Sequence, residues 1–67
     1  MTLDKAREII ADQVAIAGGY NQTATQIVLG ELQNDVGQAA VDTIINEFRL
    51  EELWGFAPGT HFERIYR

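Results

Sequence analysis

Hydrophobic residues recur at three- and four-residue steps along most of this chain, and the first such run predicts a helix over residues 3–17. The run consists of Leu3, Ala6, Ile10, Val14 and Ala17, and Ile9 and Ile16 widen the stripe. This spacing places the side chains on one face of a helix. Thr2 or Asp4 can cap the start of the helix, and the glycines at 18–19 can adopt the left-handed conformation that closes its end.

A second helix is predicted over residues 24–34. Residues 23–26 read Thr-Ala-Thr-Gln, the form of a capping box, in which a hydroxyl and an amide each satisfy a backbone donor. Its apolar positions are Ile27, Val28, Leu29 and Leu32. Gly30 costs about 1 kcal/mol relative to alanine inside a helix. Two interpretations of this glycine stay open, a close approach of another backbone or simple tolerance.

The strongest periodic segment predicts a third helix over residues 36–48. Asp35 precedes it as a cap-like residue, since a carboxylate is favourable at the positive end of a helix. The predicted buried face comprises Val36, Ala40, Val41, Ile44, Ile45 and Phe48. The hydrophobic register then changes, so we expect a break near Arg49.

After the break, the sequence predicts a short fourth helical turn at residues 50–54, ending at Gly55. Residues 57–60 read Ala-Pro-Gly-Thr and predict a type II turn, because proline presets one torsion and glycine tolerates the positive one. Residues 61–67 fit a helix or a strand equally well. We therefore expect one all-α domain over residues 1–67, built of three helices, the short turn and an ordered aromatic C-terminal extension.

Aromatic residues gather in the last third of the chain, which holds five of the six: Phe48, Trp54, Phe56, Phe62 and Tyr66. Trp54, Phe56, Phe62 and Tyr66 have two interpretations. They can fold back and complete a core that short helices leave too small. They can also stay partly exposed as anchors for another protein, as aromatic residues do at interfaces. A dimer interface would serve both purposes.

The length and the cysteine count favour self-association. A chain of 67 residues buries only about 60% of the surface that its unfolded form exposes. With no cysteine and one histidine, neither a disulfide nor a structural zinc site within one chain can compensate. We therefore expect a homodimer.

The net charge of −5 is concentrated in the middle of the chain. Residues 8–52 hold eight acidic residues against Arg49 alone, a balance of −7. Such a field repels nucleic acid and attracts basic partners. Glu47, Glu51 and Glu52 are the acidic residues expected to steer such a partner. They could form a carboxylate cluster in a continuous helix, but a solvated acidic face explains them better than a metal site.

The residue inventory argues against an enzyme. The chain has no serine and no cysteine, so the usual nucleophile and base pairs cannot form around its one histidine, His61. We therefore assign no catalytic residue, metal or cofactor. A helix-turn-helix with residues 36–48 as the recognition helix would lack the cations that phosphates require, which disfavours nucleic acid as a partner.

These observations predict a non-enzymatic, acidic protein-binding module, a small regulator or assembly factor that uses the aromatic C-terminal segment. Two alternatives stay open: an acidic inhibitor that mimics nucleic acid, and a helix-turn-helix DNA-binding protein. The first residues lack a basic and apolar export signal, and no run approaches the ~18 apolar residues of a membrane span. We therefore expect a cytoplasmic protein that does not enter membranes.

Overall fold

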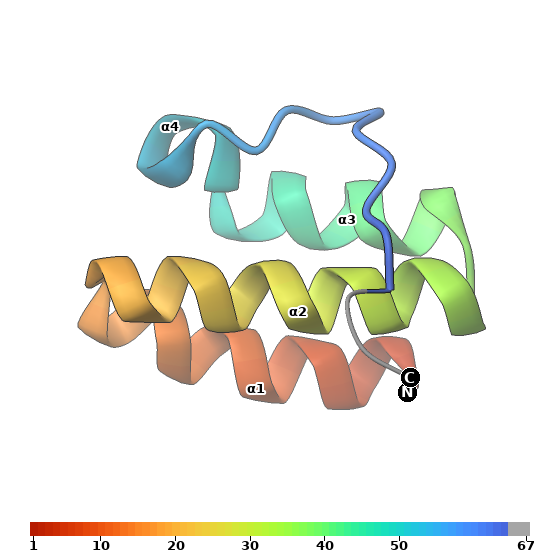
Figure 1. Ribbon diagram of the computed structural model, residues 1–67, viewed down its shortest axis with the longest axis horizontal. Coiled ribbons are helices and arrows are strands. Elements are labelled where there is room, and N and C mark those ends of the chain that lie inside the picture. Colours follow the sequence, from red (N-terminus) through yellow and green to blue (C-terminus); the bar gives the residue numbers. More distant parts are fainter. Residues whose placement is uncertain (65–67) are drawn as a thin grey trace.

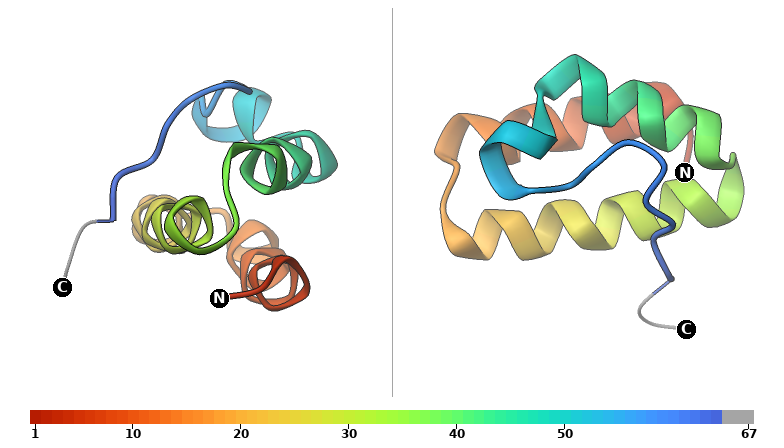
Figure 2. Two further views of the ribbon diagram at one scale, coloured as in Figure 1. Left: turned by 90° about the vertical axis from the view of Figure 1, so that its right-hand side faces the viewer. Right: turned by 90° about the horizontal axis from the view of Figure 1, so that it is seen from above.

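The computed structural model describes residues 1–64, which form a small all-α domain, as predicted. Its helices are α1 (Leu3–Ile16), α2 (Gly19–Asp35), α3 (Gln38–Phe48) and the short α4 (Leu50–Trp54). α1 and α2 run antiparallel side by side, and α3 runs back along α2 to complete a three-helix bundle (Figures 1 and 2). The described residues contain no strand.

The segment after α4 runs back over the bundle, along α3 and then across α2 (Figure 1). We call residues 55–64 the C-terminal strap. The strap begins at Gly55, which ends α4, and it contains the predicted turn, in which the Thr60 N–H donates to the Ala57 carbonyl at 3.2 Å. Gly59 takes the positive φ of 88° that this turn requires. Residues 61–64 adopt neither helix nor strand.

The start of α1 is capped as predicted, but its end is not. The Thr2 hydroxyl accepts a hydrogen bond from the Lys5 N–H at 3.1 Å. α1 ends at Ile16, and the residue in the left-handed conformation is Ala17, with φ 60°. Gly18 is extended and instead precedes the start of α2.

Helix α2 begins at Gly19, five residues earlier than predicted. The Asn21 side chain explains the difference, because its Oδ1 accepts the Gly18 N–H at 3.2 Å. Its amide group also donates to Gln13 Oε1 at 2.9 Å, which ties the start of α2 to α1. Thr23, the predicted cap, therefore lies inside the helix.

Helix α3 begins at Gln38, two residues later than predicted. Gly37 has a φ of 119°, a left-handed backbone conformation that ends the preceding helix and separates it from α3. Val36 consequently lies in the connection and is 54% exposed, so its assignment to the buried face of α3 is wrong. Asp35 belongs to the end of α2 and contacts the amino group of Met1 at 2.8 Å, rather than capping α3.

Every helix and the strap contribute to a single core. Its residues are Ala6, Ile10, Leu29, Leu32, Ala40, Val41, Ile44, Ile45, Leu50 and Phe62. The break at Arg49 is confirmed, since this residue has a φ of 55°. The break lets α4 turn back so that Leu50 is fully buried.

Candidate functional site

Three of the four predicted aromatic anchors form a chain of ring contacts along α4 and the strap. The Trp54 and Phe56 rings lie 6.1 Å apart, and the Phe56 and Phe62 rings meet edge to face at 5.4 Å. Phe62 is only 6% exposed and belongs to the core, while Trp54 and Phe56 are half-buried against it. Phe62 therefore completes the core, the first of the two interpretations. The fourth anchor, Tyr66, lies outside the described residues.

Polar contacts from α2 and α3 hold the strap in place. Asp42 Oδ1 accepts the Gly59 N–H at 2.8 Å, and the Gln38 side chain donates to the Thr60 carbonyl at 2.9 Å. Gln33 Oε1 accepts the Phe62 N–H at 3.2 Å, and Arg64 pairs with Glu31 at 2.9 Å. These four contacts follow one another along the strap and fix it above the bundle from its turn to Arg64.

The three acidic residues predicted to steer a partner do not form a carboxylate cluster. Glu47 lies on α3 and accepts two hydrogen bonds from Arg7 Nε, at 3.0 and 2.8 Å. Glu52 lies on α4 and accepts one from Arg49 Nε at 2.7 Å. The helix break at Arg49 separates Glu47 on α3 from Glu52 on α4. In the described part of the chain, no three His, Asp or Glu side chains gather where they could hold a metal ion.

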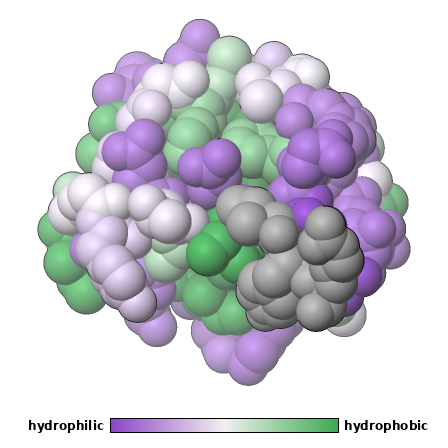
Figure 3. Space-filling view, in the orientation of Figure 1, coloured by the Kyte–Doolittle hydropathy of each residue, from purple (hydrophilic) through white to green (hydrophobic). Residues whose placement is uncertain are grey.

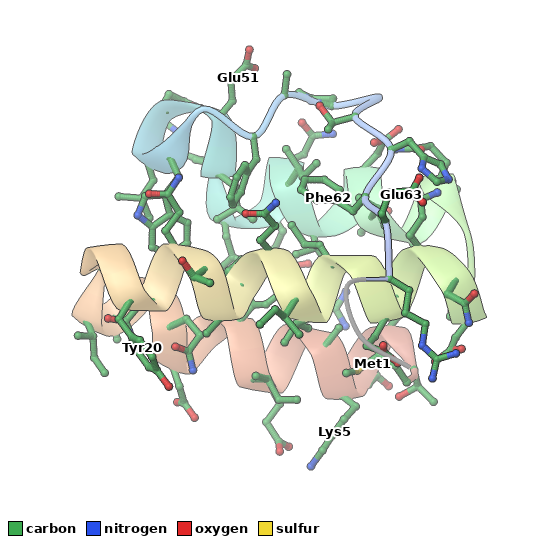
Figure 4. All side chains as sticks on the ribbon, in the orientation of Figure 1. Met1, Lys5, Tyr20, Glu51, Phe62 and Glu63 are labelled. Carbon is green, nitrogen blue, oxygen red and sulfur yellow. The ribbon has the colours of Figure 1, made fainter. Side chains whose placement is uncertain are left out.

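Glu51 differs from Glu47 and Glu52 in its surroundings. It is exposed and has no ion pair with any described residue, and Figure 4 shows its side chain pointing away from the helices. Leu53, on the same short helix, is 39% exposed although it is a large aliphatic residue. Trp54 and Phe56, half-buried, adjoin Leu53 on α4 and at the start of the strap, and Glu51 adds a carboxylate with no ion pair to a described residue. We call the surface made of Glu51, Leu53, Trp54 and Phe56 the α4 corner.

A polar cleft of about 380 Å³ opens between the C-terminal half of α2 and the strap. It is lined by Gln33 and Asn34 from α2 and by residues 61–64 from the strap. His61 Nδ1 lies 3.0 Å from Glu63 Oε2, and both side chains are exposed. None of the described lining residues is a serine, threonine or cysteine, the usual nucleophiles.

The outward face of α3 carries no cationic side chain. Its exposed residues are Ala39, Thr43, Asn46 and Glu47. No lysine or arginine lies within the helix, whereas a recognition helix in the major groove relies on cations and polar side chains directed at phosphates and base edges.

The sequence interpretation missed a second exposed apolar site, at the junction of α1 and α2. Ile16 ends α1 and is 71% exposed, and Tyr20 lies at the second position of α2 and is 85% exposed. A signal for this site was present in the sequence: residues 13–30 contain no Asp, Glu, Lys or Arg. All 15 charged residues therefore lie outside this stretch.

No protein-family model, curated protein sequence or solved structure significantly matches this chain. Within residues 1–64, none of the helices combines the length and the apolar character needed to cross a lipid bilayer.

Proposed function

We propose that this protein is a non-enzymatic binding module, a small regulator or assembly factor, whose α4 corner binds a basic amphipathic segment of another protein. The observation that carries the proposal is the exposure of Leu53 next to Trp54, on a helix whose Glu51 has no cationic partner in the described chain. Partly exposed apolar and aromatic side chains are typical anchors of protein interfaces.

Charge supports the chemistry of this partner. The chain has a net charge of −5, which attracts a basic segment at long range. Most carboxylates are already paired with cations, as Glu47 is with Arg7 and Glu52 with Arg49. Glu51 is therefore available for a lysine or arginine of the partner, while Leu53 and Trp54 receive its apolar side.

The same ion pairs give less support to an acidic inhibitor that mimics nucleic acid. Such a protein needs rows of free carboxylates in the place of phosphates. Here the carboxylates of Asp4, Glu8, Glu31 and Asp35 all contact a cationic group of this chain. The proposed module uses one free carboxylate beside an apolar surface instead.

The proposal can be tested with a tryptophan-free amphipathic peptide of leucine and lysine, because Trp54 is the only tryptophan of the protein. Binding at the α4 corner should shift the Trp54 emission to the blue and should weaken as salt is added. A peptide of the same composition in a non-amphipathic order controls for charge alone.

Two matched variants locate the site. Leu53→Lys should weaken peptide binding about tenfold, the equivalent of about 1.4 kcal/mol. Val36→Lys adds the same charge at an exposed valine beyond the end of α2 and should leave peptide binding as in the wild type. Equal affinity of the Leu53→Lys and Val36→Lys proteins, or equal binding of the two peptides, would reject the α4 corner as the site.

A further inference from the structure

The junction of α1 and α2 carries the two most exposed large hydrophobic side chains of the described residues. Ile16 is 71% exposed and Tyr20 is 85% exposed, on either side of the tight connection at residues 17–18. Figure 4 labels Tyr20 at the end of the bundle where α1 ends and α2 begins. We call Ile16, Tyr20 and this connection the α1–α2 corner.

The local fold does not account for these two side chains. The connection is made by the left-handed Ala17, whose N–H donates to the Gln13 carbonyl at 2.8 Å, and by Gly18 and Asn21. None of these contacts involves the side chain of Ile16 or Tyr20. A polar residue at either position would satisfy the connection equally well and would be better hydrated. Large apolar side chains that are exposed together are typical of surfaces that bind another molecule.

The corner is also free of charge. Residues 13–30, which include the end of α1 and the first 12 residues of α2, contain no charged side chain. The outward side of α2 presents Tyr20, Thr23 and Gln26 there, with Ile27 half-buried. Figure 3 shows apolar surface at the left edge and lower centre of the molecule, over α1 and α2, and hydrophilic surface on the right.

An uncharged surface on an acidic protein favours a second copy of the same chain over a basic partner. Two copies of a chain with a net charge of −5 repel each other, and this repulsion is smallest when they meet through a surface that carries no carboxylate. A basic partner, in contrast, gains no ion pair at this corner. The neutral corner thus fits a second copy of the chain better than a protein of opposite charge.

We propose that the α1–α2 corner is the interface of a symmetric homodimer, in which Ile16 and Tyr20 of each copy contact the same corner of the other. In a two-fold dimer both copies use the same patch, so one apolar corner is sufficient. A stable interface covers about 800 Å² per partner. This is about a fifth of the 3969 Å² that the molecule exposes, and the corner with the outward side of α2 supplies uncharged surface along most of that helix.

The proposed dimer differs from the proposed peptide site in its response to salt. Added salt screens the repulsion between two acidic copies, so dimerisation should strengthen. Peptide binding at the α4 corner should weaken under the same conditions, because there the charges attract. The two proposals can therefore fail independently.

Sedimentation equilibrium between about 10 µM and 1 mM protein, in low and high salt, tests the dimer. The wild-type protein should form a reversible dimer. Ile16→Lys should raise the dissociation constant at least tenfold, although this change brings the net charge from −5 to −4 and so reduces the overall repulsion. Val36→Lys changes the charge by the same amount at an exposed valine outside the corner and should dimerise at least as well as the wild type.

Tyr20→Gln is a second variant that adds no charge and should also weaken the dimer. Circular dichroism is used to check that each variant remains helical. A wild-type protein that stays monomeric across the whole range would overturn the proposal. So would a dimer that Ile16→Lys and Tyr20→Gln leave intact, or one that Val36→Lys weakens as much as they do.

Discussion

The carbonyl group of Glu63 lies directly over Gly30, where the C-terminal strap crosses helix α2. A Cβ atom on residue 30 would overlap the Glu63 carbonyl oxygen and would lie 3.2 Å from its carbonyl carbon. The glycine therefore marks the close approach of another backbone, the first of the two interpretations that the sequence left open. Figure 4 labels Phe62 and Glu63 on the part of the strap that leads down to this crossing.

We predict that Gly30→Ala destabilises the protein although alanine is the better helix former. Alanine gains about 1 kcal/mol from helix propensity. The clash with the Glu63 backbone forces the strap away from α2, and overpacking of this kind costs about 1–3 kcal/mol. Because Phe62 is anchored by the same strap, the net change should lower the midpoint of urea unfolding, with Trp54 fluorescence as the probe.

Gly19→Ala is the matched control for this prediction. Gly19 lies at the first position of α2, and a Cβ there would meet no atom within 4 Å. This substitution should leave stability unchanged or raise it slightly. If Gly30→Ala proved as stable as Gly19→Ala, the strap would not be held against α2 in the way described.

The sequence was most informative where the signal is local, as in the change of hydrophobic register near Arg49 and the glycines at 55 and 59. The break at Arg49, the short helix that ends at Gly55 and the turn at Gly59 all lie where the sequence predicted them. The predicted start of α2 was wrong because Asn21, rather than Thr23, caps the helix by accepting the Gly18 N–H. The Asn21 amide group also donates to Gln13 of α1. Local patterns cannot register such a contact.

The candidate surfaces were harder to predict for a related reason. Periodicity assigns an apolar side chain to a helix face, but the neighbouring elements decide whether that face is covered. Phe62 is covered by the bundle, whereas Ile16 lies at a helix end that nothing in the described chain covers. The uncharged stretch at residues 13–30 was visible in the sequence, yet its meaning depends on the exposure of Ile16 and Tyr20.

A second prediction concerns Ala17, which has a φ of 60° at the end of α1. The left-handed conformation costs a residue with a Cβ atom about 1–2 kcal/mol. Replacing alanine by glycine removes this cost. Glycine also gives the unfolded chain more conformational freedom, which lowers the stability of the fold by about 0.4–1 kcal/mol. Ala17→Gly should therefore raise the free energy of unfolding by about 0.5–1 kcal/mol in urea titrations.

Ala11→Gly makes the same chemical change at an exposed position inside α1 and should lower stability by about 1 kcal/mol. The two substitutions are thus expected to have opposite signs. A loss of stability in both would show that Ala17 does not hold the left-handed conformation in solution.

A third prediction follows from the buried hydroxyl of Thr25. This side chain is fully buried in α2, and its Oγ1 has no hydrogen-bond partner in the described structure. Burying an unpaired polar group costs about 1–3 kcal/mol, and valine has nearly the same shape. Thr25→Val should therefore raise the melting temperature by several degrees, since about 1 kcal/mol shifts a domain of this size by about 4–8 °C.

Thr43→Val is the corresponding control on α3. The Thr43 hydroxyl is exposed and donates to the Ala39 carbonyl at 2.9 Å, so its loss should change stability by no more than about 0.5 kcal/mol. If the two threonine substitutions raised the melting temperature equally, the gain in stability would come from valine itself and not from removal of the buried hydroxyl. A marked loss of stability in Thr25→Val would instead reveal a hydrogen bond to the buried hydroxyl.

The last prediction links the strap to pH through Asp42. Its Oδ1 accepts the Gly59 N–H at 2.8 Å and the Gln38 side-chain N–H at 2.9 Å. These hydrogen bonds, that from Gly59 first, lower the pKa of Asp42 below its ordinary value of 3.8. Because the folded state has the lower pKa, the stabilisation is complete well above pH 3.8 and is lost as the pH falls through the folded-state value.

Asp42→Asn should therefore make the loss of stability below pH 3.8 less steep, while the asparagine Oδ1 can still accept both hydrogen bonds. Some acid sensitivity should remain, because a hydrogen bond from the N-terminal ammonium group also lowers the pKa of Asp35. Urea midpoints measured from pH 7 to pH 2 provide the comparison, and Asp12→Asn controls for the loss of one exposed carboxylate on α1. If the Asp42→Asn curve fell as steeply as that of the wild type, Asp42 would not link the strap to α3 through its charge.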